Sequence, residues 1–417
     1  MDHQMLTFSP LCFAIQRFPK PEFETGYVQP EPQMPLPRLE ILAWLDVAVL
    51  VLTLSLVTWL ILKKRSRLGV FWVSIFSLAY FGFYRQGCVC SIGAIQNVTL
   101  GLFVGNYTVP LVVLVFFMAP LIFTLLFGRT FCAAVCPFGA IQDLVAVKPM
   151  RMGAWLNAFL GMIPYLYLGL SILFAATATD FIICRYDPFV GIFRLNASFG
   201  MFLFAGILLA SGIFIARPYC RFLCPYGVLL NWMSRFSWKH MTITPAECIQ
   251  CRLCENSCPY DAIEYPQTKK DPVGRRKQMN RMVLLVVLLP IIIAGGVWIG
   301  GLLHQTFAGV NPNVKLARML QEPYLPKDKP EPPEITAFRS SGIPQQQLMA
   351  EVAAIEHDFL VGSRIFGGFI GLVFGLTLIG LVRTPYRTDY VTNRGSCFSC
   401  AKCMDYCPII PSFHPIK

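Results

Sequence analysis

The chain has 417 residues, of which 55% are hydrophobic and only 14% are charged, and its formal net charge is +12. Its apolar residues fall in long blocks and not at amphipathic intervals, which excludes a water-soluble globular protein and predicts an all-α integral membrane protein. Basic segments beside membrane spans explain the positive charge. We expect membrane lipid as a partner. We expect no nucleic acid, because the sequence shows no surface of basic and aromatic residues of the kind that binds nucleic acids.

The N-terminal part of the chain predicts its orientation. Residues 1–40 are polar and rich in proline, without the basic start and short apolar core of a cleavable signal, so we expect a mature external tail. The apolar block 41–62 is long enough to cross a bilayer and ends in a basic cluster at 63–67, which should stay cytoplasmic. Asp46 lies within this block, either near the outer headgroups or in a quinone or proton role.

Six further apolar blocks follow, at 69–84, 109–127, 155–176, 199–215, 282–303 and 361–382. The sequence therefore predicts about seven transmembrane helices in an inner (cytoplasmic) membrane, with the N-terminus outside and the C-terminus cytoplasmic. Lys and Arg are more numerous in the segments assigned to the inside, most steeply just before residue 282.

A run of cysteines follows the fifth block. Its residues fit the pattern CxxCxxCxxxCP and are Cys248, Cys251, Cys254 and Cys258. This is the spacing with which bacterial ferredoxins bind one 4Fe-4S cluster through three thiolates and send the fourth to a neighbouring cluster. A structural zinc site is the alternative, but zinc sites usually split their ligands into two separated pairs.

A second run of the same pattern lies near the C-terminus, at Cys397, Cys400, Cys403 and Cys407. Two spans separate the runs, so both are expected on the same face of the membrane. We expect them to exchange fourth ligands and hold two 4Fe-4S clusters. One cluster would use Cys248, Cys251, Cys254 and Cys407, and the other Cys397, Cys400, Cys403 and Cys258. The alternative is two separate four-cysteine sites.

An internal repeat predicts a third site. The segment that starts CysProPheGly at Cys136 is similar to the one that starts CysProTyrGly at Cys224, and the segment after Cys90 resembles both. Each half is then a pair of spans with a CxxxCP corner inside, and the two halves are parallel. The corners would bring together Cys132, Cys136, Cys220 and Cys224 as one further iron-sulfur site, or these thiols are separate and structural.

Three other cysteines fall on the expected outer side and make a possible outer cluster: Cys88, Cys90 and Cys184. Asp187 or Cys12 would be the fourth ligand; alternatively, the three are buried free thiols. Basic side chains beside the inner corners either stabilise anionic clusters or are ordinary inside-facing charges: Arg129, Arg217 and Arg221. One or two iron-sulfur clusters beyond the first two are therefore expected.

The predicted domains follow from these spans and runs. They are an external tail at 1–40, a transmembrane core with a duplicated helix pair at 41–240, a cytoplasmic ferredoxin run at 241–281, a helix at 282–303, an external Pro-rich loop at 304–360, a helix at 361–383 and a cytoplasmic second run at 384–417. The two runs together should form a two-cluster ferredoxin-like module. The Pro-rich loop is either a docking segment or a solvated spacer.

Two CxxxCP corners followed by CxxCxxCxxxCP resemble the NosR/NapH family of membrane-bound polyferredoxins, over roughly residues 69–262. The resemblance implies an inner-membrane electron-transfer protein that connects quinol or cytoplasmic donors to a periplasmic reductase or its maturation. This chain departs from the family in two respects. No flavin-binding domain like that of NosR precedes the first span, and the second ferredoxin run is separated from the first by two extra spans.

We expect an electron-transfer subunit of an oxidoreductase system that serves an external redox partner, a flavoprotein or a reductase. Two alternatives stay open: a quinol dehydrogenase with its own quinone site, and a maturation or regulatory factor for a metalloenzyme. Haem is not expected, because CxxCH is absent and no two histidines pair across the centre of two spans. No flavin site is evident in this chain.

Overall fold

The computed structural model describes residues 39–87, 91–105, 107–147, 150–243, 249–266, 272–321, 332–383 and 389–408. The chain divides into two compact units, each described here by itself: the larger contains Arg38–Leu303 and Leu360–Lys417, and the smaller Met1–Pro37 and His304–Phe359. The described residues are mostly helical, as predicted, and contain one two-stranded sheet.

The helices of the first half are α1 (Glu40–Trp59), α2 (Arg67–Ser77), α3 (Ser91–Phe103), α4 (Leu111–Phe127), α5 (Pro137–Val145), α6 (Ala154–Leu160), α7 (Ile163–Ala176), α8 (Ile182–Tyr186), α9 (Pro188–Arg194), α10 (Phe199–Gly212), α11 (Pro218–Phe222) and α12 (Pro225–Arg235). Turns of π-helix lie at Leu60–Lys64, Leu78–Tyr84 and Phe131–Val135. The second half contains α13 (Leu253–Ser257), β1 (Ile263–Glu264), α14 (Pro272–Ala308), α15 (Pro312–Gln321), α16 (Pro333–Ser340), α17 (Gln345–Val382), β2 (Val391–Thr392) and α18 (Lys402–Asp405).

Five helical segments are long and apolar enough to cross a membrane, judged by length and composition among the described residues. They are Glu40–Lys64, Arg67–Tyr84, Ala154–Ala176, Gly274–Ala308 and Gln345–Val382. Each contains one of the seven predicted blocks, and the last two extend well beyond it. The multi-pass character of the protein therefore follows from the structure as well as from the sequence.

The other two predicted spans differ from the expectation. At 109–127 the structure has the 17-residue helix α4, and at 199–215 it has α10, which is only 14 residues long. At 1.5 Å per residue these helices measure about 26 Å and 21 Å, less than a hydrocarbon core of about 30 Å. α10 follows α9 at a bend of 109°, so the pair is a broken span or a re-entrant loop, and counting it raises the total to six.

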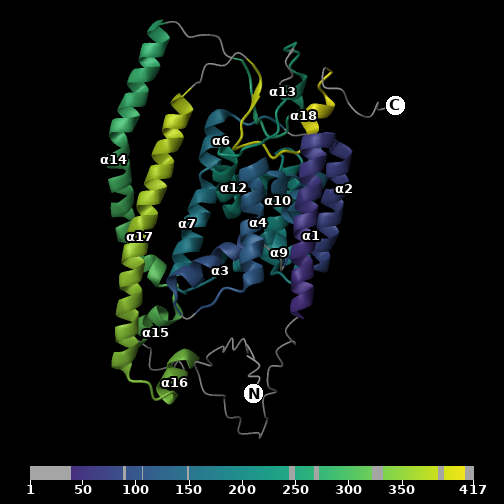
Figure 1. Cartoon of the computed structure of the whole chain (residues 1–417). Coiled ribbons are helices and arrows are strands. Elements are labelled where there is room, and N and C mark those ends of the chain that lie inside the picture. The colour runs from purple at the N-terminus through teal and green to yellow at the C-terminus, as the bar shows by residue number, and fades with distance from the viewer. Residues whose placement is uncertain are drawn as a thin grey trace, which may run out of the picture. The chain divides into compact units, whose positions relative to one another are not determined.

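The core of the larger unit is built around the helices that precede and follow the CxxxCP corners. α4 packs against α1, α3 and α12, and α7 packs against α3 and α12 (Figure 1). Short helices that begin with proline, α5, α9, α11 and α12, follow sharp turns within this bundle. Proline at the first helical position has a suitable φ and needs no amide donor. The prolines that follow Cys136, Asp187, Arg217 and Cys224 each start one of these helices.

Helices α14 and α17 pack at very close range through glycines. A Cβ added to Gly296 would collide with the carbonyl of Gly367, and one added to Gly300 would collide with the carbonyl of Ser363. Small residues permit this approach, which supplies van der Waals contact between helices in a bilayer, where apolar burial contributes little. The pair is visible side by side in Figure 1.

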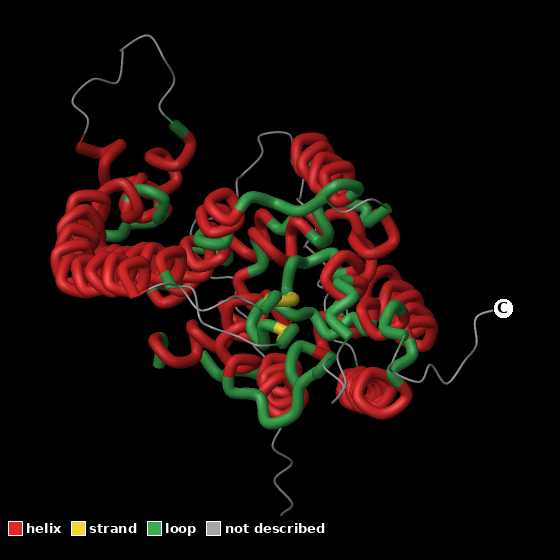
Figure 2. Tube along the Cα trace, turned by 90° about the horizontal axis from the view of Figure 1, so that it is seen from above, coloured by secondary structure: helices red, strands yellow, loops and turns green. Residues whose placement is uncertain are grey.

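The C-terminal segment returns to the middle of the chain. β2 pairs with β1 in an antiparallel sheet, with Ile263 opposite Thr392 and Glu264 opposite Val391 (Figure 2). The amide of Asn393 extends this pairing by donating to the carbonyl of Ala262 at 2.7 Å. Helices α13 and α18, one from each ferredoxin run, also lie in contact.

The smaller unit has its own apolar core. Its buried side chains come from α15, α16 and the first half of α17: Val314, Ala317, Ile335, Phe338, Leu348 and Val352. Polar contacts join α15 to α17, with Asn313 donating to Glu351 at 3.1 Å and Arg318 3.8 Å from Glu356. The described part of 304–360 is therefore folded into helices, whereas the sequence predicts a Pro-rich loop there.

Candidate functional site

The two CxxxCP corners converge in the larger unit. Cys132 lies in the π-helical turn before α5 and Cys136 is the N-cap of α5, while Cys220 lies in α11 and Cys224 is the N-cap of α12. Burial raises the pKa of Cys224 far above its ordinary value, and the thiolates of the other three raise it further. The structure therefore places the four predicted thiols of the inner site together.

A glutamine connects the two corners. Gln142, in α5, accepts a hydrogen bond from the amide of Tyr219 at 3.0 Å and donates to the Sγ of Cys220 at 3.3 Å. Its side chain is fully buried. Gln142 is not among the residues predicted from the sequence. The available signal was its position in the repeat, six residues after Cys136, which Gln96 shares six residues after Cys90.

Buried arginines surround the inner corner. Arg217, fully buried, pairs with Asp143 at 2.5 Å and donates to the carbonyls of Cys132 and Ala133. The same Asp143 accepts from Tyr260 at 3.0 Å. Burial would raise the pKa of Asp143, but Arg217, Arg67 and Tyr260 outweigh it and hold this pKa below its ordinary value.

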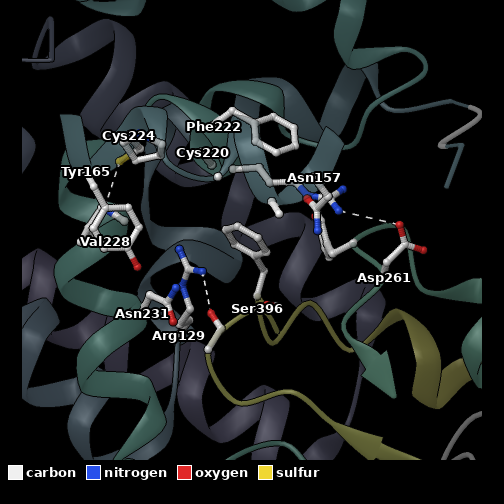
Figure 3. A pocket seen from close by; sticks show the side chains of 18 of the residues that line it. Arg129, Asn157, Tyr165, Cys220, Phe222, Cys224, Val228, Asn231, Asp261 and Ser396 are labelled. Carbon is white, nitrogen blue, oxygen red and sulfur yellow. Dashed lines mark hydrogen bonds and ion pairs between the residues drawn. The ribbon is translucent and has the colours of Figure 1, made fainter. Parts of the chain in front are cut away.

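A cavity of about 270 Å³ opens between the inner corner and the ferredoxin runs. Cys220 and Cys224 line one part of it, and the loop around Ser396 lines another (Figure 3). Arg129 and Arg221 also line it, and within the described residues Nε of Arg129 and one terminal nitrogen of Arg221 are buried without a hydrogen-bond partner. Cysteine sulfurs beside unsatisfied cationic donors form an environment suited to an anionic cluster.

The donor set is better suited to a cluster than to one ion. Burial raises the pKa of Cys220 to about 12, against the lowering effect of Arg217. Thiols in such surroundings ionise only when a cation takes the place of the proton. Among the described residues, no three His, Cys, Asp or Glu side chains are placed to hold a single metal ion. An iron-sulfur cube is several ångströms across and holds its thiolates farther apart than one ion does.

The second site is the ferredoxin module, made of the two cysteine runs. Its loops share a backbone pattern: Gln250 and Arg252 in the first run, and Ser399 and Ala401 in the second, have positive φ at matching distances from the first cysteine. Non-glycine residues adopt this conformation infrequently, so its repetition indicates a common loop that the ligands require. In the second run the amide of Ser399 donates to the Sγ of Cys397 at 3.4 Å.

The fourth cysteine of the first run lies near the second run. Burial raises the pKa of Cys258, and the negative charge of Cys400 contributes. Cys403 shows the reverse relationship: burial raises its pKa, and the charges of Cys400, Cys397, Cys258 and Cys254 add to the effect. Cys248 lies outside the described residues, Cys251 is exposed and Cys407 is half-buried. The structure thus brings the two runs together, with Cys258 beside the set that it was expected to complete.

The expected outer site is described only in part. Cys12, Cys88 and Cys90 lie outside the described residues, and Cys184 is exposed. Asp187 is the N-cap of α9: one oxygen accepts from Phe189 and Val190, and the other from the hydroxyl of Tyr219. These bonds give its carboxylate a structural role beside the inner corner, and its role as a fourth ligand stays a prediction.

One feature of the inner corner recurs beside Cys184. Gln96, six residues after Cys90, accepts from the amide of Ile183 at 3.1 Å, as Gln142 accepts from the residue before Cys220. Gln96 is fully buried, and its Nε2 has no hydrogen-bond partner among the described residues. A sulfur acceptor near Cys184 would satisfy it, as Cys220 satisfies Gln142.

The remaining candidate, Asp46, is structural in this fold. It is 1% exposed, lies 2.9 Å from Arg85 and accepts from the hydroxyl of Tyr80 at 2.8 Å. A buried carboxylate needs such a partner, because an unpaired charge in this position is costly. The ion pair thus explains Asp46 without a quinone or proton role.

Comparison with known protein families identifies iron-sulfur domains in both sites. A 4Fe-4S binding domain matches residues 109–161 and 197–243, which contain the four cysteines of the inner corner. A second 4Fe-4S binding domain matches 241–264, which contains the first ferredoxin run. The expected iron-sulfur character is therefore confirmed.

Curated relatives confirm the resemblance to the NosR/NapH family. Protein NirI of Paracoccus denitrificans is 31% identical over 51% of this chain and 32% of its own length. The regulatory protein NosR of Pseudomonas aeruginosa is 30% identical over 48% of this chain and 30% of its own, and the putative electron transport protein YccM of Escherichia coli is 25% identical over 40% and 52%. The chain thus spans about a third of NirI and half of YccM. No solved structure matches it.

Proposed function

We propose that this protein is a membrane electron-transfer protein that relays electrons through 4Fe-4S clusters between the cytoplasmic side or the quinone pool and an external redox partner. The observation that carries the proposal is that the inner corner and the ferredoxin module line one cavity. Tyr260 and Phe398, from the two ferredoxin runs, have ring centroids 4.7 Å apart, and both line the cavity beside Cys220 and Cys224.

The ferredoxin module would hold two clusters with exchanged fourth ligands. The sheet between β1 and β2 supports this, because it fixes the second run against the first. Cys258 would complete the site of Cys397, Cys400 and Cys403, whose charges act on one another. Cys407 would complete the site of the first run.

The inner corner would hold a third cluster through Cys132, Cys136, Cys220 and Cys224. When bound, such clusters supply one-electron chemistry, while the chain contributes ligation, burial and nearby charge. Gln142 orients Cys220, and Arg217 holds the backbone of the Cys132 turn by bonding its carbonyls. A relay needs such stations at different depths, because a single transfer step does not cover an apolar layer of about 30 Å.

We place the ferredoxin module in the cytoplasm, because the basic segments of the sequence lie beside it. The smaller unit would then be external and offer a folded surface for a flavoprotein or reductase, the role predicted for the loop at 304–360. The outer cysteines, with Gln96 oriented by Ile183, would be the last station on that side.

Quinol oxidation is a second candidate function, favoured by one observation. An apolar cavity of about 610 Å³ lies between α7, α14 and α17 in the larger unit. It adjoins the inner corner, because Ile163 and Leu166 face it while Tyr165, on the same helix, lines the cavity beside Cys220. Its lining suits an isoprenoid tail.

The decisive test is the content of iron and labile sulfide per purified chain, followed by a redox titration. We expect at least three 4Fe-4S clusters, and loss of one on Cys136→Ser with the ferredoxin signals kept. An unchanged cluster content in that variant would refute the inner site. Reduction of the clusters by a quinol analogue that the variant Leu166→Trp prevents would support the second function. If the analogue does not reduce the clusters, quinol oxidation is refuted and only the relay function is retained.

A further inference from the structure

Arg129 lies between the two sulfur sites. It follows α4 and is 5% exposed. One terminal nitrogen is 3.8 Å from the Sγ of Cys132 in the inner corner, and the other donates to the carbonyl of Gly395 at 3.0 Å. Its guanidinium carbon is 4.1 Å from the ring centre of Phe398. Since Gly395 and Phe398 flank Cys397, one side chain contacts both sites. Figure 3 shows Arg129 beside the loop of Ser396.

Among the described residues, no carboxylate balances the charge of Arg129. Neighbouring arginines are paired, Arg217 with Asp143 at 2.5 Å and Arg221 with Asp261 at 3.8 Å. Across the described part of the chain, Arg129 forms no such ion pair, and its Nε has no hydrogen-bond partner. A buried cation without a counter-charge is strongly disfavoured, so negative charge must come from another source.

We infer that Arg129 is a positioning residue shared by two iron-sulfur sites, whose charge balances the thiolates of the inner corner and of the second ferredoxin run and raises both reduction potentials. The inference rests on the proposed function, because it requires clusters at both places. A four-thiolate cluster is anionic and gains one more negative charge on reduction. A nearby cation in a medium of low dielectric constant therefore favours the reduced state, and so does a hydrogen bond donated to a ligand sulfur. Arg129 can supply both.

The position of Arg129 makes the effect common to both sites. Its guanidinium group is planar and delocalised, and it can stack on Phe398 while its two terminal nitrogens point in different directions. Lysine offers one point charge and cannot keep all three contacts. Loss of this one residue should thus lower both potentials together.

The test is a redox titration of the full-length protein with Arg129→Gln, followed by electron paramagnetic resonance. The two signals are assigned beforehand with Cys136→Ser and Cys400→Ser. We expect both midpoint potentials to shift downward in the glutamine variant, with iron and sulfide content unchanged. Potentials that stay the same, or a shift at only one site, would overturn the inference.

Arg235→Gln is the matched control. Arg235 also approaches Gly395, at 3.3 Å from the position of an added Cβ, but it is solvent-exposed and bonded to Asn231. Because exposed charges are screened, this variant should leave both potentials where they are. An equal shift in both variants would contradict a specific role for Arg129.

Arg129→Lys is the second test if the glutamine variant does not accumulate. Since lysine loses at least one of the three contacts, at least one potential should fall, and two unchanged potentials would overturn the inference. Failure of the proposed function is recognised separately. In that case the unmutated protein lacks the inner signal, and Cys136→Ser removes no iron.

Discussion

Ile263 lies opposite Thr392 in an antiparallel sheet that joins the two ferredoxin runs, although two long helices separate these residues along the chain. The pairing holds the C-terminal cysteines against the middle of the chain. The cysteine runs therefore form one structural module, and damage to one should reach the other.

Removing the residues after Arg394 should damage both ferredoxin clusters. If the fourth ligands are exchanged, the truncation removes Cys407 from the first-run cluster and three thiolates from the other cluster. Cys407→Ser is the milder variant and should perturb the signal assigned to Cys251 and Cys254. Electron paramagnetic resonance of the reduced protein provides the measurement, and a change confined to the cluster of Cys397 would refute the exchange.

Replacement of Gln142 by leucine should lower the potential of the inner site and destabilise the fold. The variant loses the donor to Cys220 and leaves the buried amide of Tyr219 unsatisfied, which costs about 1–3 kcal/mol. Asn97→Leu is the control, because Asn97 is only partly buried on α3. The redox and thermal midpoints are measured for both variants. If neither midpoint differs between them, the role of Gln142 is contradicted.

Asp143→Asn should destabilise the protein at neutral pH by about 3–5 kcal/mol, because it leaves the buried charge of Arg217 without its main partner. The pKa of Asp143 is lower in the folded than in the unfolded state. Its stabilising effect is therefore complete above the ordinary value of about 3.9 and is lost as pH falls through the folded-state pKa.

The thermal midpoint in detergent, followed from pH 7 to pH 3, measures this effect. The difference between Asp143→Asn and the unmutated protein should narrow at the acidic end. Asp180→Asn is the control, because Asp180 pairs at 3.0 Å with the largely exposed Arg185 and such pairs contribute little. A constant difference across the pH range would show that the charge of Asp143 is not responsible.

Alkylation of apo-protein should distinguish the two faces of the membrane. Cys251 and Cys184 are both exposed, and the proposed orientation places them on opposite sides. Cys251 should react only in inverted vesicles and Cys184 in intact cells, each tested in a background where the other is serine. Reaction of Cys251 in intact cells would reverse the orientation.

Gly367→Leu should separate α14 from α17, because a side chain there meets the carbonyl of Gly296 in the neighbouring backbone. Overpacking of this kind typically costs about 1–3 kcal/mol. Gly380 is the matched control in the same helix, since an added Cβ there has nothing within 4 Å. Thermal midpoints in detergent should fall for Gly367→Leu and hold for Gly380→Leu; equal midpoints would exclude close packing as the reason for the glycine.

The sequence alone determined the chemistry of the sites and most of the helices. Ligand spacing is a local property, so CxxCxxCxxxCP specifies a loop that encloses one cluster wherever it lies in the fold. Long apolar blocks are local as well, and five of the seven predicted spans appear as long apolar helices. The CysPro pairs likewise start helices in the structure at Cys136 and Cys224, because proline at the first position favours this conformation.

Only the tertiary structure decided which side chains surround those sites. Gln142 bonds to Cys220 and Arg129 approaches Phe398 across large separations in sequence, and no periodicity encodes such contacts. The bend of 109° between α9 and α10 is also a tertiary result: α9 packs its aromatic Phe189 against Phe138 instead of continuing the span. Spacing specifies ligands within one loop, whereas the charge and hydrogen bonds around them depend on which distant segments the fold brings into contact.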